Sequence, residues 1–457
     1  MMGKRCSRIA GLILALAICL TALSPVYAGA EALQDCHKVT NTYTETKGAN
    51  KTVVRLWHVE TALEAVTQEI NGIAEKYAEE LGAGLPEAKD YNDRNSRLDV
   101  EIRYSRTGLS WMSFMVQART IYHRELTDQQ FTTRTYDMKT GMRITLGMIF
   151  DEESEAWKLL ADRVRETVLA YWPDVEPDAE ALERICSRSE LEKADFTLHG
   201  MSLVLHYPAA ALYEGKNTLI EVNVFYPEIR DMMMEKAWTE TDNKSYYKMA
   251  ALTFDDGPKA QNSPKTIDVL MEKGIRATFF CIGNLVGVHP WVVQREHDEG
   301  HAVASHNWHH GSPKNVSAKG LRAMPEQVNK AMIKVIGIPV RYNRVPGGAY
   351  PSMVKAKVEW PFIQWSLDTY DWRNERPVRT IMNSVRKKLA DGDIILCHDI
   401  KGHTPEVAQK IADYLAEQGY MLLTIDELFA KDGVKLENGQ VYYRCVDGET
   451  SKKPGGT

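Results

Sequence analysis

The feature that most constrains the fold is a regular alternation of short apolar segments with helical segments from Met249 onward. The apolar segments read MAALTF, ATFFCIG, HAVASH, FIQWSLD, DIILCH and YMLLTI, and stretches with helical periodicity such as GLRAMPEQVNKAMIKVIG lie between them. Such alternation is typical of a parallel sheet, either open or closed into a barrel. In both forms the functional residues collect at the carboxyl ends of the strands. We therefore predict an α/β domain with its site at these ends.

Residues 31–235 have a different pattern of apolar residues. Apolar residues recur at steps of three and four from Val59 to Leu81, which predicts an amphipathic helix. The segments at 98–104 and 112–118 alternate as strands do, DMKTGMR is typical of a hairpin turn, and residues 157–168 are again helical. The late segments FTLHGMSLVLHY and NTLIEVNVFY predict two more strands. This pattern predicts a smaller α+β domain, followed by a linker at 236–248, the α/β domain at 249–434 and a tail at 435–457.

The first 28 residues have the features of a secretory signal. Lys4, Arg5 and Arg8 precede an apolar stretch from Ile9 to Leu23, and Val26 and Ala28 stand where a signal peptidase requires small residues. The stretch falls short of the ~20 residues that a membrane span needs. We expect a secreted or cell-surface protein, and an uncleaved signal that holds it to the membrane is the alternative. No later segment is predicted to span a bilayer.

The net charge limits the classes of binding partner, and the number and spacing of cysteines limit the possible disulfides. The formal charge is −6, and loss of the three positive residues of the signal makes it −9, which argues against nucleic acid. After removal of Cys6 and Cys19, an odd number of cysteines remains, without the paired spacing of a disulfide framework or metal knuckle: Cys36, Cys186, Cys281, Cys397 and Cys445. At least one thiol is therefore expected to be unpaired.

Polar residues follow the predicted strands of the second domain. Asp255 and Asp256 end the first, SHNWHH ends the third, RVPGG follows a helix, DTYDW ends FIQWSL, and His398 ends DIILC. Adjacent carboxylates repel each other, so the pair needs a cation, a shared proton or abundant water.

His306 and His310 are spaced so that both imidazoles can point to one position, and a carboxylate beside them completes a metal site. Two histidines and one carboxylate suit zinc with positions left open for water and substrate. The same set describes the facial triad of non-haem iron oxygenases. The third possibility is an ordinary pair of surface or core histidines.

Five motifs, TFDDGP, SHNWHH, RVPGG, DTYDW and ILCH, make residues 249–434 resemble the NodB-type polysaccharide deacetylases of carbohydrate esterase family 4. KDGVKLENGQVYY also resembles the tail of bacterial members. The resemblance implies a distorted (β/α) barrel, a divalent metal, usually zinc, and removal of acetyl groups from extracellular sugars.

The resemblance also implies roles for individual residues. Asp256, His306 and His310 would bind the metal, and Asp255 would be the general base, held by Arg344.

The remaining roles concern the leaving group and the acetyl pocket. His398 would be the general acid, supported by Asp371, while the backbone N–H of Gly347 would stabilise the oxyanion. Trp372 and Leu396 would contact the acetyl methyl group.

Three positions depart from the family pattern. Asn307 stands where a serine or threonine is usual, and Gly347 stands where a tyrosine is common. His309 precedes His310 and is a neighbouring candidate ligand, although the family spacing favours His310.

Residues 31–235 resemble extracytoplasmic domains that precede some bacterial deacetylases and occur in lysozyme-sensing anti-sigma factors, which implies a wall or protein contact. We expect hydrolysis of N-acetyl groups of peptidoglycan, at N-acetylmuramic acid or N-acetylglucosamine. Chitooligosaccharides, an exopolysaccharide and xylan are alternative substrates. A non-catalytic wall- or lysozyme-binding receptor is the alternative of a different class.

Overall fold

A computed structural model describes residues 38–47, 52–85, 96–122, 125–373 and 376–450. The predicted signal at 1–28 and Cys36 lie outside the described residues.

The N-terminal region begins with a six-stranded sheet in the order β1 (Val39–Lys47), β2 (Val53–Thr61), β3 (Arg97–Thr107), β4 (Trp111–Tyr122), β5 (Glu125–Asp137) and β6 (Met142–Ile144). Helix α3 (Glu64–Gly82) connects the parallel neighbours β2 and β3, and the other pairs are antiparallel. Val66, Ile70 and Ala74 of α3 pack on alternate residues of β3 and β4. The predicted strands and hairpin are confirmed.

One boundary of the predicted helix is wrong. Val59 belongs to β2, and α3 begins at Glu64. Val59 is four residues before Leu63 and also alternates with the buried Trp57, so it fits both a helical and a strand periodicity.

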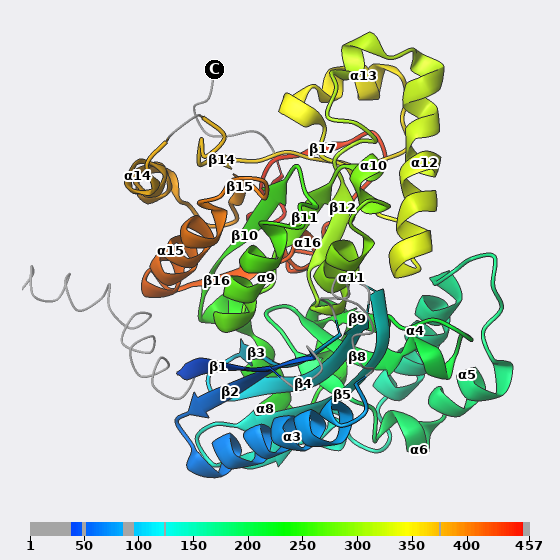
Figure 1. Ribbon diagram of the computed structural model, residues 1–457, viewed down its shortest axis with the longest axis vertical. Helices are drawn as coiled ribbons and strands as arrows, with labels where there is room; N and C mark the ends of the chain where they lie inside the picture. Colours follow the sequence, from blue (N-terminus) through cyan, green and yellow to red (C-terminus); the bar gives the residue numbers. More distant parts are fainter. Residues whose placement is uncertain (1–37, 48–51, 86–95, 123–124, 374–375, 451–457) are drawn as a thin grey trace, which may run out of the picture.

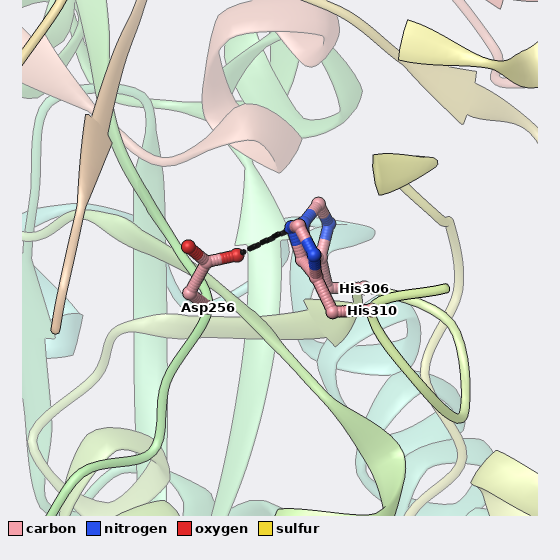
Figure 2. A group of neighbouring side chains, drawn as sticks. All are labelled: Asp256, His306 and His310. Carbon is pink, nitrogen blue, oxygen red and sulfur yellow. Dashed lines mark ion pairs between the residues drawn. The ribbon is translucent and has the colours of Figure 1, made fainter. Parts of the chain in front are cut away.

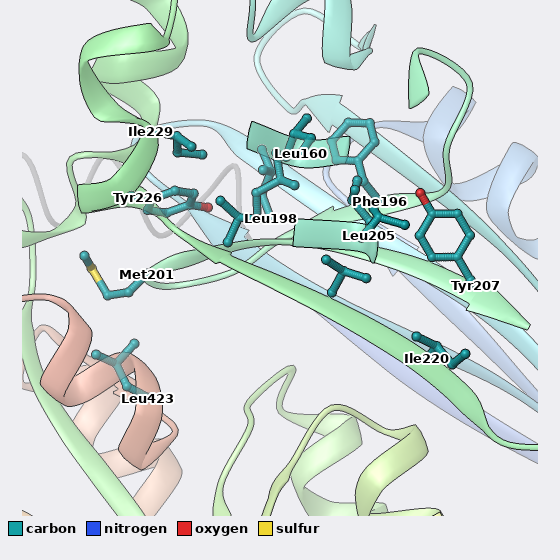
Figure 3. Packing of buried hydrophobic residues seen from close by; sticks show 14 of the residues in the cluster. Leu160, Phe196, Leu198, Met201, Leu205, Tyr207, Ile220, Tyr226, Ile229 and Leu423 are labelled. Carbon is teal, nitrogen blue, oxygen red and sulfur yellow. The ribbon is translucent and has the colours of Figure 1, made fainter. Parts of the chain in front are cut away.

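A second, three-stranded antiparallel sheet follows, formed by β7 (Phe196–Leu198), β8 (Ser202–Pro208) and β9 (Leu219–Phe225). Helices α4 (Ala156–Ala170), α5 (Ala179–Ile185) and α6 (Arg188–Leu191) accompany it. The predicted helix at 157–168 and both late strands are confirmed. Figure 3 shows Leu160 of α4 packed near Phe196, Leu198 and Leu205, with Leu423 of the C-terminal region in the same cluster. One hydrophobic core therefore includes both regions.

The predicted linker is folded and packed. After α7 (Tyr226–Ile229), residues 236–248 include most of α8 (Glu235–Thr241) and a 3-10 turn. The buried Asn243 amide donates to the carbonyl of Gly200 at 2.7 Å and accepts from the N–H of Gly108 at 2.7 Å. The exact domain boundaries stay predictions.

The C-terminal region has a parallel sheet in the order β12 (Ala302–Ser305), β11 (Thr278–Cys281), β10 (Lys248–Asp255), β15 (Ile394–His398) and β14 (Leu367–Asp368), and β16 (Tyr420–Leu423) pairs with the first half of β10. The FIQWSLD segment forms two short strands. Its first part, β13 (Phe362–Ile363), is joined to β12 through isolated bridges at Asn343, and its second part is β14. These links close the sheet into an irregular ring, so the predicted distorted (β/α) barrel after a smaller α+β region is confirmed.

Helices surround this barrel (Figure 1). They are α9 (Ser263–Glu272), α10 (Gly283–Val286), α11 (Pro290–Asp298), α12 (Ala318–Ile336), α13 (Tyr350–Lys355), α14 (Val378–Lys388), α15 (Thr404–Glu417) and α16 (Ile425–Ala430). The described part of the predicted tail adds β17 (Val441–Tyr442), which pairs with β13.

The N-terminal region packs against the amino ends of the barrel strands. Arg276, just before β11, donates to Ser202 at 3.1 Å, and Glu299, just before β12, accepts from Arg119 at 2.7 Å. The carboxyl ends of the strands lie at the opposite end of the barrel (Figure 1).

Two further expectations concern the described part of the chain. Within it, no helix combines the length and apolar character needed to cross a membrane. The described cysteines, Cys186, Cys281, Cys397 and Cys445, are buried free thiols.

Candidate metal and catalytic site

Strand pairing brings the predicted site residues to one end of the barrel. Asp255, the last residue of β10, lies opposite His398, the last residue of β15, and opposite Phe280 of β11. His306 follows β12 directly, and β12 pairs with β11. Because parallel strands end at the same edge, three separated motifs meet here.

Asp256, His306 and His310 form a compact group (Figure 2). Oδ1 of Asp256 is 3.3 Å from Nε2 of His306 and 3.1 Å from Nε2 of His310. These three potential ligand atoms lie within 4.8 Å of one another.

The chemistry of this group fits a cation. Nδ1 of His306 is 2.7 Å from the carbonyl oxygen of Arg344, so Nδ1 carries the proton of the neutral ring and Nε2 presents a lone pair toward Asp256. Oδ1 of Asp256 is buried without a hydrogen-bond donor. Converging lone pairs of two imidazoles and a carboxylate suit zinc or another divalent metal that accepts nitrogen and oxygen ligands.

Protonation and exposure agree with this assignment. Burial opposes ionisation of Asp256, but the nearby imidazoles of His306 and His310 outweigh burial and hold the pKa of that carboxyl well below its usual range. The His306 side chain is 2% exposed and that of His310 is 55% exposed, so the group is open to solvent on the side of His310. Water and substrate can approach there.

Asp255 has a different partner from its neighbour. Nη1 of the fully buried Arg344 donates to Oδ1 of Asp255 at 2.8 Å and to the hydroxyl of Thr253 at 2.7 Å. The rest of the guanidinium donates to the carbonyl oxygens of Ile363 and Gln364. A cation fixed on several sides holds the Asp255 carboxyl group in one orientation. Its other oxygen is 3.8 Å from Nε2 of His306, beside the metal group.

His398 and Asp371 form a second pair. Nδ1 of His398 is 2.7 Å from Oδ1 of Asp371, and the backbone N–H of His398 donates to Oδ2 at 2.8 Å. Burial lowers the pKa of His398, but the bond to Asp371 and the charges of Asp371, Asp255 and Asp256 raise it above its ordinary value overall. The imidazole therefore favours its cationic form.

The three predicted substrate contacts lie on separate elements. Gly347 sits in a 3-10 turn three residues after Arg344, with φ at 61° and open space where a Cβ would be. Leu396 is buried on β15, on the same strand face as His398. Trp372 follows Asp371, is 44% exposed, and its indole N–H lies 3.5 Å from Asp368.

The structure also accounts for Asn307. Its backbone has φ at 64°, a left-handed conformation that asparagine tolerates better than most residues. Its side-chain oxygen accepts from the amide of Asn343 at 2.9 Å, and its N–H donates to Asn343 at 3.1 Å. The neighbouring His309 is not part of the metal group, which contains His310.

Thr253, Thr369 and Asn343 were not singled out by the sequence. Thr253 shares a strand face with Asp255, so alternation within TFD was a usable signal. Thr369 accepts from Asp371 N–H and donates to Oδ1 of that residue at 3.2 Å. Asn343 precedes Arg344 directly, but nothing local to that motif indicates its partner Asn307.

Comparison with known proteins agrees with these motifs. Residues 242–360 match the family model for polysaccharide deacetylase. A peptidoglycan N-acetylglucosamine deacetylase of Bacillus cereus is 32% identical over 199 residues, which cover 42% of this chain and 91% of that relative. The peptidoglycan N-acetylglucosamine deacetylase PgdA of Listeria monocytogenes is 29% identical over 318 residues, covering 69% of this chain and 67% of that relative.

Among solved structures, that of the peptidoglycan deacetylase PdaC from Bacillus subtilis is 30% identical and covers 40% of this chain and 91% of its own, with a TM-score of 0.39. The family match and the near-complete coverage of the Bacillus cereus relative confirm the family predicted from the motifs. The chain belongs to the polysaccharide deacetylases of carbohydrate esterase family 4, which are hydrolases.

Proposed function

We propose that this protein hydrolyses N-acetyl groups of peptidoglycan amino sugars in a metal-dependent reaction. The observation that carries the proposal is the division of partners at one barrel end: Asp256 lies with two histidines, while Asp255 is bonded to Arg344. The relatives named above act on peptidoglycan by name, which supports this substrate.

Asp256, His306 and His310 would hold the metal. A divalent cation there supplies Lewis acidity toward the acetyl carbonyl and lowers the pKa of water. Zinc fits two nitrogen ligands and one oxygen ligand.

The first chemical step requires a base. The Asp255 carboxylate, held in place by Arg344, can accept one proton from the water that attacks the acetyl carbonyl carbon. The backbone N–H of Gly347 is a candidate donor to the oxyanion that forms as the carbonyl π electrons move to oxygen.

The second step requires an acid. Protonated His398, held by Asp371, can donate its proton to the sugar nitrogen as the C–N bond breaks. The products are acetate and a free amine on the sugar. One proton enters Asp255 and one leaves His398, so proton exchange with solvent restores both groups.

We also propose action outside the cytoplasm, since the substrate is extracellular and residues 1–28 have the pattern of a secretory signal. A pulse-chase of the full chain in a bacterial host, with and without residues 1–28, tests export. Retention of both forms inside the cell would contradict this localisation.

The test of activity is acetate release from isolated peptidoglycan and from N-acetylglucosamine oligomers. The enzyme is measured as purified, after chelation and after zinc is restored. Metal-dependent release from peptidoglycan is the expected result. Release only from N-acetylglucosamine oligomers would contradict peptidoglycan as the substrate, and binding of peptidoglycan without any release would favour the non-catalytic receptor.

A further inference from the structure

We propose that Arg373, Arg376 and Lys388, gathered around Tyr370, bind a carboxylate of the peptide attached to the glycan. This inference rests on the proposed peptidoglycan substrate and adds a contact that selects peptide-bearing glycan over neutral glycan. We call these four residues the basic cluster.

Three cations approach one aromatic ring. The guanidinium carbon of Arg373 lies 4.7 Å from the Tyr370 ring centroid, that of Arg376 lies 5.4 Å away, and Nζ of Lys388 lies 5.0 Å away. Arg373 and Arg376 precede helix α14, whereas Lys388 is its last residue. Cation–π contacts with Tyr370 hold the three charges together.

These charges have no carboxylate partner among the residues that the structure describes. No ion pair within 4.0 Å involves Arg373, Arg376 or Lys388 there. The side-chain hydrogen bond of Arg376 goes to the neutral Ser384, and its Nε is buried without an acceptor. Like charges in proximity repel each other, so an anion that joins them would relieve the repulsion.

The local composition is opposite to that of the whole chain. Residues 372–390 contain six Lys or Arg and one acidic residue, Glu375, although the chain carries a formal charge of −6. Cations are favoured in the last turn of a helix, which explains Lys387 and Lys388 without any ligand. The same effect disfavours Arg373 and Arg376 near the first turn, so helix electrostatics do not account for them.

The basic cluster adjoins the catalytic residues. The rings of Tyr370 and Trp372 are 6.4 Å apart, and the Arg373 guanidinium carbon is 5.2 Å from the Trp372 ring centroid. Trp372 follows Asp371, which holds His398. A group bound at the cluster would therefore belong to the same substrate as the sugar at the catalytic residues.

The chemistry of the substrate identifies the group. Acetylated amino sugars without substituents are neutral, whereas the peptides of peptidoglycan carry free carboxylates. Arginine binds carboxylates through paired N–H donors, and two arginines and a lysine together favour an anion over a neutral sugar.

The experiment compares two soluble substrates, a glycan fragment with free peptide carboxylates and a neutral N-acetylglucosamine oligomer. The variants are Arg373→Gln, Lys388→Gln and the double variant. Lys387→Gln is the matched control, because Lys387 is an exposed neighbour on the same helix without a contact to the Tyr370 ring among the described residues.

We expect the ratio of kcat/KM for the charged substrate to kcat/KM for the neutral substrate to fall about threefold in each single variant and about tenfold in the double variant. The change should come from a higher KM for the charged substrate. Raising the salt concentration to about 0.5 M should reduce the wild-type ratio in the same direction.

An unchanged ratio in the double variant, or an equal fall in Lys387→Gln, would overturn the proposal. So would an unchanged wild-type ratio after the peptide carboxylates are amidated. A preference that appears only with teichoic acid attached would assign the cluster to phosphate instead. Direct binding of both fragments to the protein is measured in parallel. Charge-dependent binding without acetate release would contradict the proposed deacetylase activity but not the carboxylate-binding role of the basic cluster.

Discussion

At the scale of single residues, the two adjacent aspartates differ in their partners. Asp255 accepts from Arg344, and Asp256 lies against His306 and His310. We expect Asp255→Asn to lower kcat about 10²- to 10⁴-fold, because the base is lost, while bound zinc stays near one per chain. Metal analysis and acetate release on the same preparations provide the measurement.

The matched control is Asp256→Asn, which should lose both zinc and activity because it removes a ligand. Loss of zinc from Asp255→Asn as well would mean that both carboxylates bind the metal, and would contradict the separate roles.

Asp371 is expected to set the pH range in which His398 can act as the proposed general acid. Because the Asp371 bond and nearby carboxylates raise the pKa of His398, its proton is retained to higher pH than in a free imidazole. In Asp371→Asn the attraction is lost and the pKa of His398 falls. The alkaline limb of the kcat profile should therefore move to lower pH, with little change in the acid limb.

Full pH profiles of kcat for wild type and Asp371→Asn test this. A shift of the acid limb instead would mean that His398 does not act as the general acid. Identical pH profiles for wild type and Asp371→Asn would mean that Asp371 does not control the pKa of His398.

The site was largely predictable at this scale because short motifs combine residue type with position at a strand end. Asp256, His306 and His310 lie together as the motifs predicted, and their metal-binding role stays a prediction. The residues that hold this group in place were harder to predict from the sequence. Asn307 and Asn343 bond to each other across 36 positions, and neither motif alone contains the information that these two loops meet.

At the scale of elements, helix α12 ends where the two regions touch. Its C-cap, Gly337, has φ at 87°, and a Cβ there would lie 2.7 Å from Cδ1 of Tyr171 and 2.8 Å from the ring of Trp172. Its carbonyl also accepts from the N–H of Trp172 at 2.6 Å. We expect Gly337→Ala to lower the free energy of unfolding by about 2–4 kcal/mol, from a strained left-handed backbone and an overpacked contact.

Denaturant unfolding measures this change. Gly287→Ala is the control, since Gly287 also caps a helix but has φ at −73° and open space around it. A loss in Gly337→Ala no larger than in the control would show that the contact relaxes without cost.

Helices and strands with one clear periodicity of apolar residues were predicted well. Segments whose apolar pattern fits more than one arrangement were not. The strands around Leu98 and Met112 alternate without interruption, and both were found. FIQWSLD reads as one strand, but the structure divides it into β13 and β14 because its two parts pair with different neighbours. Pairing partners are a property of the closed barrel, so no local pattern reveals the break.

At the scale of the whole molecule, a buried ionic network joins the N-terminal sheet to the barrel. Glu299 accepts from Arg119 at 2.7 Å and from Arg295 at 2.5 Å. Arg119 also bonds to Glu101, and Arg295 reaches Glu101 and Asp268. The carboxylate of Glu299 is 1% exposed, so its charge is compensated inside the protein.

Removing that charge should affect both regions together. Glu299→Gln leaves two buried guanidinium groups short of a partner, and we expect it to lower the free energy of unfolding by about 3–5 kcal/mol. Glu183→Gln is the control, because its pair with Arg165 is exposed and should contribute about 0–1 kcal/mol.

The pH dependence follows from the pKa of Glu299. Burial would raise this pKa, but Arg295 and Arg119 outweigh burial and lower it in the folded protein. A lowered folded-state pKa contributes stability that is fully present above the unfolded-state pKa of about 4.3 and is lost as the pH falls through the folded value. The stability difference between wild type and Glu299→Gln should therefore be largest near neutral pH and shrink below about pH 4. Urea unfolding of both proteins across this pH range measures it, and a difference that grows on acidification would mean that the network opposes folding.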